Sequence, residues 1–487
     1  MADYYVDLTD GSDSNNGTTV LTPFKTFAPI NSGGFWLRGN RVLVKRGSRG
    51  IVDAGTRANI ECNSGAGRLV ITTYGDVNLP LPVIDGAGTA FNPFWIRAGS
   101  AIDVSNLHVT NALANCMAIE PPTGSSTDIS DVTISDCIVS FCGQGAGIIG
   151  VDGLRIGSIE FSQATVTNIR VNRVVAKDNG GHGIKVRGYA SDVIIKDCIA
   201  LRNGYLSPSH GMGTSGSFVQ LAGSGWTNIS GNVWEKTVSV PGTASFDGSW
   251  TFVHVLGAAP IYSLYPSSTP ATPGPGEVGF GAANTIRINL NGVNPNTVSS
   301  IAAHFNSPDS VWFVNCVSMY TVDSNGIEGQ GIYFDSGSFR CFARNCVSAY
   351  NEGHGYYTNQ ATNCSFIDST GVANGKGAAS SAASNSTTFL GMVLDANGLP
   401  GVNYNTGNAL GLVLSSKILN ASVGITSNDI VTNTVQENRN QFIACTTRLQ
   451  NVSDPGADSV DLASELFTAR GLVSWANKQV ARAEALI

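Results

Sequence analysis

A short motif, in which one polar residue stands between two small residues, recurs along the chain and carries residues that could do chemistry. Three of the six histidines occupy its middle position. Histidine ionises near neutral pH and is suited to general acid–base catalysis. The copies read Gly181-His182-Gly183, Ser209-His210-Gly211, Gly329-Gln330-Gly331, Gly353-His354-Gly355 and Gly375-Lys376-Gly377.

The spacing of these copies indicates a repeat. The centres lie 28 residues apart from His182 to His210, 24 from Gln330 to His354, and 22 from His354 to Lys376. A period of this size is typical of stacked supersecondary units, each of which buries its apolar face against its neighbours. The glycines are expected to form tight turns at the rim of such a stack.

The composition of the 487 residues agrees with many short strands and turns. Charged residues make up only 13%, and there are 57 glycines. The net charge of −7 provides no overall basic field for nucleic acid. No apolar run approaches the ~20 residues that span a bilayer. The first residues lack the basic and apolar regions of a signal peptide, so none is predicted.

Four of the ten cysteines occupy one recurring position, preceded by Asp or Asn and followed by Ile or Val. Free cysteine behaves as a small apolar side chain. The sequence therefore predicts stacked, buried thiols rather than disulfides, and synthesis in a reducing compartment. The four positions are Cys137, Cys198, Cys316 and Cys346.

The strands of a coil can be identified in residues 184–204. Residues 193–198 read as a first strand, ending at an Asp or Asn able to take the left-handed conformation. Residues 199–203 form a second strand, and the run Ile184-Lys185-Val186-Arg187 is the third strand of the preceding coil. Three strands per coil suit a parallel helix with roughly 4.8 Å between coils. Coils are predicted to begin near Val104, Val132, Ile169, Val193, Val311, Cys341, Cys364, Phe389 and Leu412.

The remaining segments divide the chain into five parts. We expect an N-terminal cap with the first coils in 1–90, further coils in 91–216, a β-rich insertion in 217–305 that packs beside the rim, and coils again in 306–455. The last part, 456–487, has apolar residues spaced by four and three, a helical pattern. This helix either caps the last coil or forms an oligomer interface.

The N-terminal motifs YYVD, GSDSNNGT and TPFKTF, followed in order by GNRVLVKRG, ITTYG and PVIDG, resemble a known family. The chain is similar over residues 4–450 to the right-handed parallel β-helix proteins related to pectate lyases and phage tailspikes. The motifs are quite specific for that fold and only weakly specific for a reaction. The resemblance implies an all-β, right-handed, single-stranded parallel β-helix.

Alternation along the third strand gathers polar residues on one outer face. Ile184 and Val186 should point inward, and Lys185 and Arg187 outward. We select as candidate catalytic residues His182, His210, His354, Asp335 and Glu328, and as candidate substrate-binding residues Lys185, Arg187, Tyr333, Tyr357, Asn359 and Glu120. The alternative is that these rim residues are simply solvated.

Two reactions fit this set. Exposed tyrosines suit sugar rings, and Lys185 with Arg187 could neutralise a uronate while His or Tyr abstracts the C5 proton for β-elimination. Alternatively, Asp335 with Glu120 or Glu328, on coils two apart and ~9–10 Å from each other, would hydrolyse a glycosidic bond at the wide edge of the inverting range. A Ca²⁺-assisted lyase would need clustered Asp on the third strand, which the sequence lacks, so no cofactor is predicted.

The leading hypothesis is a phage tailspike-like polysaccharide depolymerase that acts on a bacterial polysaccharide. It would be a homotrimer on the virion tail or outside the cell, with other virion tail proteins as further partners and no nucleic acid or membrane span. Two alternatives stay open. One is a non-catalytic glycan-binding adhesin or structural spike, and the other is a secreted bacterial polysaccharide lyase.

Overall fold

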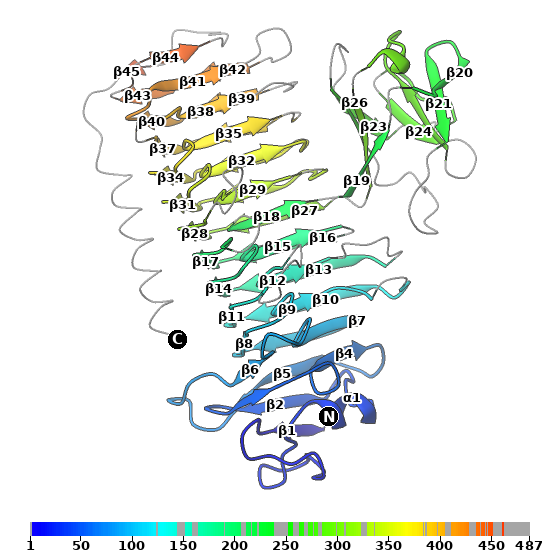
Figure 1. Cartoon of the computed structure of the whole chain (residues 1–487), viewed down its shortest axis with the longest axis vertical. Helices are drawn as coiled ribbons and strands as arrows, with labels where there is room; N and C mark the ends of the chain where they lie inside the picture. Colours follow the sequence, from blue (N-terminus) through cyan, green and yellow to red (C-terminus); the bar gives the residue numbers. More distant parts are fainter. Residues whose placement is uncertain are drawn as a thin grey trace.

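Short parallel strands stacked coil upon coil form most of the computed structural model (Figure 1). The structure describes residues 2–122, 125–143, 151–157, 164–188, 190–205, 211–215, 217–221, 224–237, 252–256, 263–266, 271–275, 277–280, 285–298, 300–305, 308–322, 329–335, 337–382, 384, 387–396, 398–404, 411–427, 435–438, 440–443, 445, 447–450 and 460–461. Within these residues the predicted fold, a right-handed parallel β-helix, is confirmed by the strand pairings.

Each coil contributes one strand to each of three faces. The first-strand face consists of β1 (Asp3–Val6), β2 (Arg41–Lys45), β5 (Leu69–Tyr74), the second half of β7 (Phe94–Ser105), β10 (Ile129–Ser135), β13 (Val166–Asn172), β16 (Ala190–Lys196), β27 (Asp309–Val314), β30 (Phe342–Arg344), β33 (Ser365–Ile367), β36 (Thr387–Leu390), β39 (Gly411–Leu414) and β42 (Val435–Asn438). All nine predicted coil starts lie in these strands or directly before one of them.

The second-strand face is built from β3 (Arg49–Ile51), β6 (Val83–Asp85), β8 (His108–Thr110), β11 (Ile138–Ser140), β14 (Val175–Lys177), β17 (Ile199–Leu201), β28 (Val317–Met319), β31 (Val347–Ala349), β34 (Thr370–Val372), β37 (Val393–Asp395), β40 (Lys417–Leu419), β43 (Gln441–Ile443) and β45 (Val460–Asp461). The third-strand face is built from β4 (Ala58–Cys62), the first half of β7, β9 (Met117–Ile119), β12 (Leu154–Ile156), β15 (Ile184–Arg187), β18 (Met212–Ser215), β29 (Ile332–Phe334), β32 (Tyr356–Asn359), β35 (Ala379–Ala382), β38 (Val402–Tyr404), β41 (Val423–Ser427) and β44 (Thr447–Gln450).

The corner between the first and second strands depends on left-handed residues. The Asp or Asn that precedes each recurring cysteine has a positive φ, as predicted. Short polar side chains tolerate this conformation better than others because they can bond locally to the backbone. The values are 54° at Asp136, Asp197 and Asn315, and 52° at Asn345.

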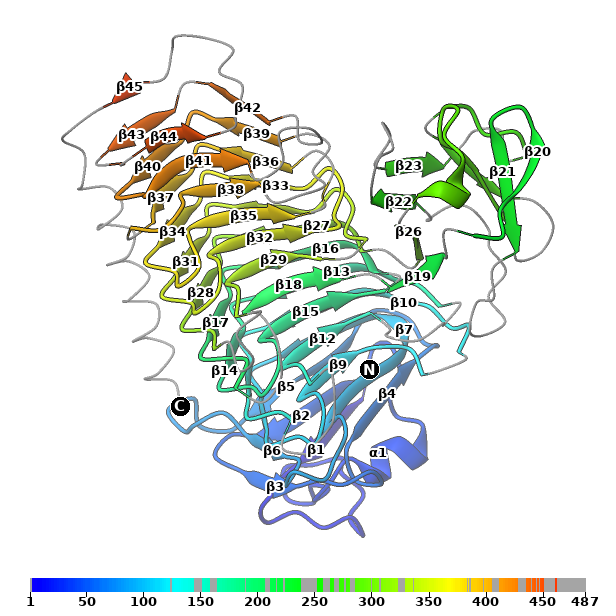
Figure 2. The same cartoon turned by 45° about the horizontal axis from the view of Figure 1, so that its top comes forward.

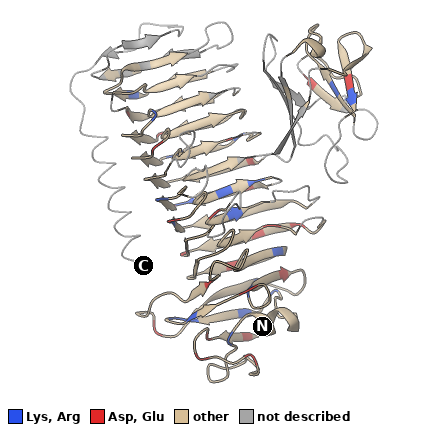
Figure 3. Ribbon diagram, viewed as in Figure 1, with Lys and Arg blue, Asp and Glu red and all other residues tan. Residues whose placement is uncertain are grey.

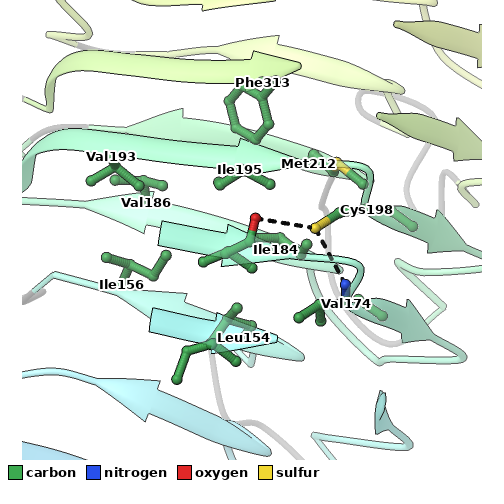
Figure 4. Close-up of a cluster of buried hydrophobic side chains, with 14 of the residues drawn as sticks. Leu154, Ile156, Val174, Ile184, Val186, Val193, Ile195, Cys198, Met212 and Phe313 are labelled. Atoms are coloured by element: carbon green, nitrogen blue, oxygen red, sulfur yellow. Dashed lines mark hydrogen bonds between the residues drawn. The ribbon is translucent and has the colours of Figure 1, made fainter. Parts of the chain in front are cut away.

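Inward side chains from all three faces meet in one continuous core. Figure 4 shows Leu154, Ile156, Ile184 and Val186 from the third-strand face packed with first-strand residues and Cys198. All ten cysteines are free, and nine are buried, as the recurring position predicted. The thiols also bond to the backbone, as when Val174 N donates to Cys198 Sγ at 3.4 Å.

A ladder of buried asparagines lines the turn that leads to the third strand. Asn179 Nδ2 donates to Asn203 Oδ1 at 2.9 Å, and Asn351 Nδ2 donates to Asn374 Oδ1 at the same distance. In three of the motifs the second glycine packs against this ladder, at Gly183, Gly331 and Gly355. A Cβ on Gly331 would stand 1.8 Å from Ser348 Oγ and 2.7 Å from Asn351 Nδ2. Close packing, rather than the predicted tight rim turn, therefore requires this glycine.

The two ends and the insertion differ from the regular coils. The N-terminal segment includes the short helix α1 (Ala28–Gly33), whose Ile30 joins the core with Phe24 and Phe27. The insertion forms an eight-stranded sheet that stands to one side of the coils (Figure 2). Its elements are β19 (Ser217–Leu221), β20 (Thr227–Ser230), β21 (Val233–Thr237), β22 (Phe252–Leu256), β23 (Ser263–Pro266), β24 (Glu277–Phe280), β25 (Thr285–Asn289), the 3-10 helix η1 (Pro295–Thr297) and β26 (Ser300–Phe305). The predicted C-terminal helix lies outside the described residues, apart from the short strand β45.

The packing of Gly331 gives a test of the fold. We expect Gly331→Ala to lower the free energy of unfolding by about 1–3 kcal/mol, because the new methyl group must displace Ser348 and Asn351. Urea unfolding measures the effect. Gly55→Ala is the control, since its Cβ would meet only Asp53 Oδ1 at 3.5 Å. Equal midpoints for the two variants would contradict this account of the glycine.

Candidate functional site

One outward-facing row runs along the third-strand face and contains three of the candidate residues, Lys185, Tyr333 and Tyr357. Strand pairing aligns, from one coil to the next, Trp95, Ala118, Arg155, Lys185, Gly213, Tyr333 and Tyr357, which we call the outer row. Ile184 and Val186 point into the core, so the predicted alternation in β15 is confirmed. Figure 3 shows basic residues on the middle strands of the stack and few charges on the later coils.

Lys185 lies at the end of a chain of hydrogen bonds that begins on the preceding coil. Arg155 Nε donates to Asp152 Oδ2 at 2.8 Å, and His182 Nδ1 donates to Asp152 Oδ1 at 2.9 Å. Lys185 Nζ donates to His182 Nε2 at 3.1 Å. Asp152, Arg155 and His182 are buried, whereas Lys185 is half-buried at the outer end of the chain. Both ring nitrogens of His182 are occupied, so this histidine acts on Lys185 rather than on a sugar.

Burial and neighbouring charges shift the pKa values in this cluster. Burial by itself would raise the pKa of Asp152, but Arg155 and the His182 hydrogen bond outweigh it and hold that pKa well below its ordinary value. Burial, reinforced by Lys185, lowers the pKa of His182 to about 4, against the opposing effect of Asp152. Burial lowers the pKa of Lys185 to about 8, with Arg187 acting in the same direction.

A second row of charged groups lies two residues further along the strands. It contains Glu120, Arg187, Asp335 and Asn359, whose Nδ2 donates to Asp335 Oδ1 at 3.1 Å. Burial, followed by repulsion from Arg155, lowers the pKa of Arg187, while Asp335 and Glu120 are among the carboxylates that oppose the shift. Arg187 therefore lies between carboxylates on either side.

This row corrects the predicted hydrolytic pair. Glu120 and Asp335 follow strands four pairing steps apart, from β9 through β12, β15 and β18 to β29. At about 4.8 Å per step they are roughly 19 Å apart, twice the separation of inverting carboxyl pairs. The sequence predicted a separation of two coils, whereas the strands β12, β15 and β18 lie between β9 and β29. The other proposed partner, Glu328, lies outside the described residues.

Aromatic rings cover the outer face on the coils that follow the cationic groups in the direction of the C-terminus. Tyr333 and Tyr357 stack with ring centroids 5.5 Å apart, and His354 stacks on Tyr357 at 5.4 Å. Tyr357 is half-buried, but Tyr333 is only 6% exposed. The expectation of two exposed tyrosines is therefore wrong for Tyr333, which packs against Tyr357 on one face.

Two buried polar atoms beside these rings have no hydrogen-bond partner among the described residues. They are Gln330 Oε1 and His354 Nδ1, on adjacent coils. Burial, with Lys376 contributing, lowers the pKa of His354 to about 4, so its ring is neutral at pH 7. Buried polar groups are normally satisfied by protein or water, so these two atoms stand out as unused hydrogen-bonding groups on this face.

Between the cationic and the aromatic part of the outer row, one coil has no side chain. Gly213 occupies this position, and a Cβ there would lie 2.6 Å from Tyr333 O and 3.3 Å from Tyr333 Cδ1. Lys185 and Tyr333 are two pairing steps apart, or roughly 10 Å. Tyr333 therefore packs against the Gly213 backbone, and only a glycine fits between it and Lys185 in the row.

The structure thus brings together most of the predicted residues and adds two. His182, Lys185, Arg187, Tyr333, Asp335, His354, Tyr357 and Asn359 share this part of the face, whereas His210 lies outside the described residues. Asp152 and Arg155 were missed. A signal existed, because Asp152-Gly153-Leu154-Arg155 has the same pattern as His182-Gly183-Ile184-Lys185.

Neither a metal site nor a membrane span is found in the described part of the chain. No group of three or more His, Cys, Asp or Glu side chains there could hold a metal ion. None of the helices described has both the length and the apolar character needed to cross a bilayer.

Comparison with known proteins gives similarity only at the level of structure. No family model matches the sequence, and no curated protein matches it. Solved structures that match include the pectate lyase Pel9A (9% identity over 94% of this chain and 79% of that chain, TM-score 0.40) and the A-module of the Azotobacter vinelandii mannuronan C-5 epimerase AlgE4 (11%, 95% and 100%, TM-score 0.42). A third is tailspike protein 3 of bacteriophage CBA120 (10%, 93% and 61%, TM-score 0.44). At these values the function has to be argued from this chain's own residues.

The buried histidines predict a loss of stability in acid. Burial lowers the pKa of His108, His182 and His354 from 6.5 to about 4. Between pH 6.5 and 4 the unfolded chain therefore binds more protons, so the free energy of unfolding should fall as the pH falls through this window. Urea unfolding at several pH values measures the slope. His354→Phe should reduce it, and an unchanged slope would contradict the neutral, buried state of this ring.

Proposed function

We propose that the chain binds an acidic polysaccharide along the third-strand face and cleaves it by β-elimination, with Lys185 as the proton acceptor. The observation that carries this proposal is the position of the Lys185 amine. It is buried enough for its pKa to fall to about 8, it is held by His182, and it lies next to the coil without a side chain at Gly213.

The lowered pKa makes Lys185 a usable base near neutral pH. With a pKa of about 8, roughly a tenth of the amine is uncharged at pH 7, whereas an ordinary lysine with a pKa near 10.4 would have only about four parts in ten thousand. A base with a pKa close to the working pH is the most effective in general base catalysis.

The neighbouring residues suit the other requirements of the reaction. Lys185 removes the proton at C5 of a uronate, the C4–O bond breaks, a C4=C5 double bond forms, and the departing oxygen takes a proton from solvent. Negative charge builds up on the uronate carboxyl group as the proton leaves, and Arg187 is placed to stabilise it. Asp152 and Arg155 act indirectly, by fixing the His182 ring that accepts the Lys185 hydrogen bond.

The aromatic part of the face is suited to binding further sugars. Tyr357 offers a half-buried ring, and Gln330 Oε1 and His354 Nδ1 are free to bond with hydroxyl groups. Asn359 and Asp335 lie alongside, already bonded to each other. A chain of sugars running across the coils would meet these groups in succession.

The second candidate function is binding without cleavage, as in an adhesin or structural spike. It is favoured by the hydrogen bond from Lys185 Nζ to His182, which suits a protonated amine acting as an anion ligand. Hydrolysis is less well supported, because Glu120 and Asp335 are too far apart. We propose that the chain is a homotrimeric, tailspike-like depolymerase on a virion tail or outside the cell. Light scattering of the purified chain tests the trimeric state. A secreted bacterial lyase would use the same face.

Substitution of Lys185 tests the reaction. On a panel of polyuronates, we expect the wild-type chain to form unsaturated uronate, seen as ultraviolet absorbance, with a rate that rises with pH towards about 8 as the amine loses its proton. Lys185→Met should lower the rate at least ~100-fold, the usual contribution of a general base. The control is Lys196→Met, an exposed lysine on the first-strand face.

Three other outcomes of this experiment would change the proposed function. Cleavage by Lys185→Met at the wild-type rate would rule out this residue as the base. Reducing ends without unsaturated products would indicate a hydrolase. Binding of a polyuronate with no product from any member of the panel would leave the glycan-binding protein as the function.

A further inference from the structure

The third-strand face carries a second cationic and aromatic cluster, closer to the N-terminus. Arg57 Cζ lies 4.9 Å and Arg97 Cζ 4.6 Å from the centre of the Trp95 ring, so both guanidinium groups are held on the indole. Trp95 belongs to the outer row and donates from Nε1 to Glu120 O at 2.7 Å. The cluster thus connects directly with the charged row beside Arg187.

The charges of this cluster are not balanced. Arg97 pairs with Glu61 at 3.1 Å, while its buried Nε has no hydrogen-bond partner among the described residues. Arg57 donates from Nε to Asn59 Oδ1 at 3.0 Å and has no carboxylate partner in the described part of the chain. Burial, followed by repulsion from Arg97, lowers the pKa of Arg57. Two like charges held this close, with one carboxylate between them, favour a bound anion.

A polar depression adjoins the cluster. It has a volume of about 640 Å³ and its lining includes Asp13, Asn31, Ser32 and Asn59. Asn59 is the strand partner of Trp95 in the pairing of β4 with β7. The amides of Asn31 and Asn59 and the hydroxyl of Ser32 suit the hydroxyls of a sugar ring, and the Trp95 indole suits its apolar face. The Asp13 carboxylate in the lining already accepts hydrogen bonds from Lys25 N and Thr26 N.

We infer that Arg57, Trp95 and Arg97, with the depression at Asn59, form a separate subsite for an anionic sugar. Trp95 and Lys185 are three pairing steps apart, or roughly 14 Å, along the same row. A polyanionic glycan bound at Lys185 therefore reaches this subsite only if it extends several sugars towards the N-terminus. The inference rests on the proposed function for the direction of the glycan, but not on cleavage.

Affinity for polyuronates of two lengths tests the subsite. Calorimetry uses the Lys185→Met background, with ultraviolet absorbance followed in parallel to confirm that no product forms. The probes are oligogalacturonate and oligoalginate, each in a short fraction (dimers) and a long fraction. Arg57→Gln combined with Arg97→Gln should weaken binding of the long fraction at least about tenfold. The effect should decrease as salt is raised.

The controls separate this inference from the proposed function. Arg46→Gln removes an arginine of the N-terminal coils whose side chain bonds to Leu79 O, and should leave affinity unchanged. Equal affinity of the double variant and its parent for the long fraction would overturn the subsite, whether or not Lys185 proves to be the base. An equal loss for long and short fractions would also overturn it, because a short glycan at Lys185 cannot reach Trp95.

Discussion

The hydrogen bonding of each strand to the strand one coil above is the interaction on which the rest of this structure depends. It fixes a spacing of about 4.8 Å between equivalent residues of successive coils. Side chains that recur at equivalent positions of the sequence therefore form rows along the stack, whether they are apolar side chains, thiols, amides or charged groups. The asparagine ladder is the clearest consequence, since Asn179 and Asn203 bond to each other because their coils are adjacent.

The same spacing makes the candidate site a linear arrangement rather than a pocket. Groups on adjacent coils are in contact, as in the chain from Asp152 through His182 to Lys185, whereas groups four coils apart cannot act on one bond. This explains why the buried cationic cluster supports proton abstraction and not a carboxyl pair. In the proposed function, one extended glycan contacts both Trp95 and Tyr357 although they lie far apart along the row.

The position of Lys185 illustrates how burial and charge act together. Removal of the amine from water disfavours its charged form, and Arg187 adds to that effect, while Asp152 limits it. The resulting pKa of about 8 depends on neighbours from three different coils. A lysine in the same register but on an exposed strand would keep its ordinary charge and could bind an anion, but it would be a poor base at neutral pH.

The sequence by itself determined the coil, because the fold follows from patterns that are local or periodic. The Asp or Asn before each cysteine, the alternation in residues 184–187 and the spacing of the glycine motifs predicted the left-handed corners, the outward row and the buried thiols. The tertiary structure decided which coils are neighbours. It separated Glu120 from Asp335, brought Asp152 and Arg155 beneath Lys185, and buried Tyr333, since these outcomes depend on the number of intervening coils and on side-chain packing between them.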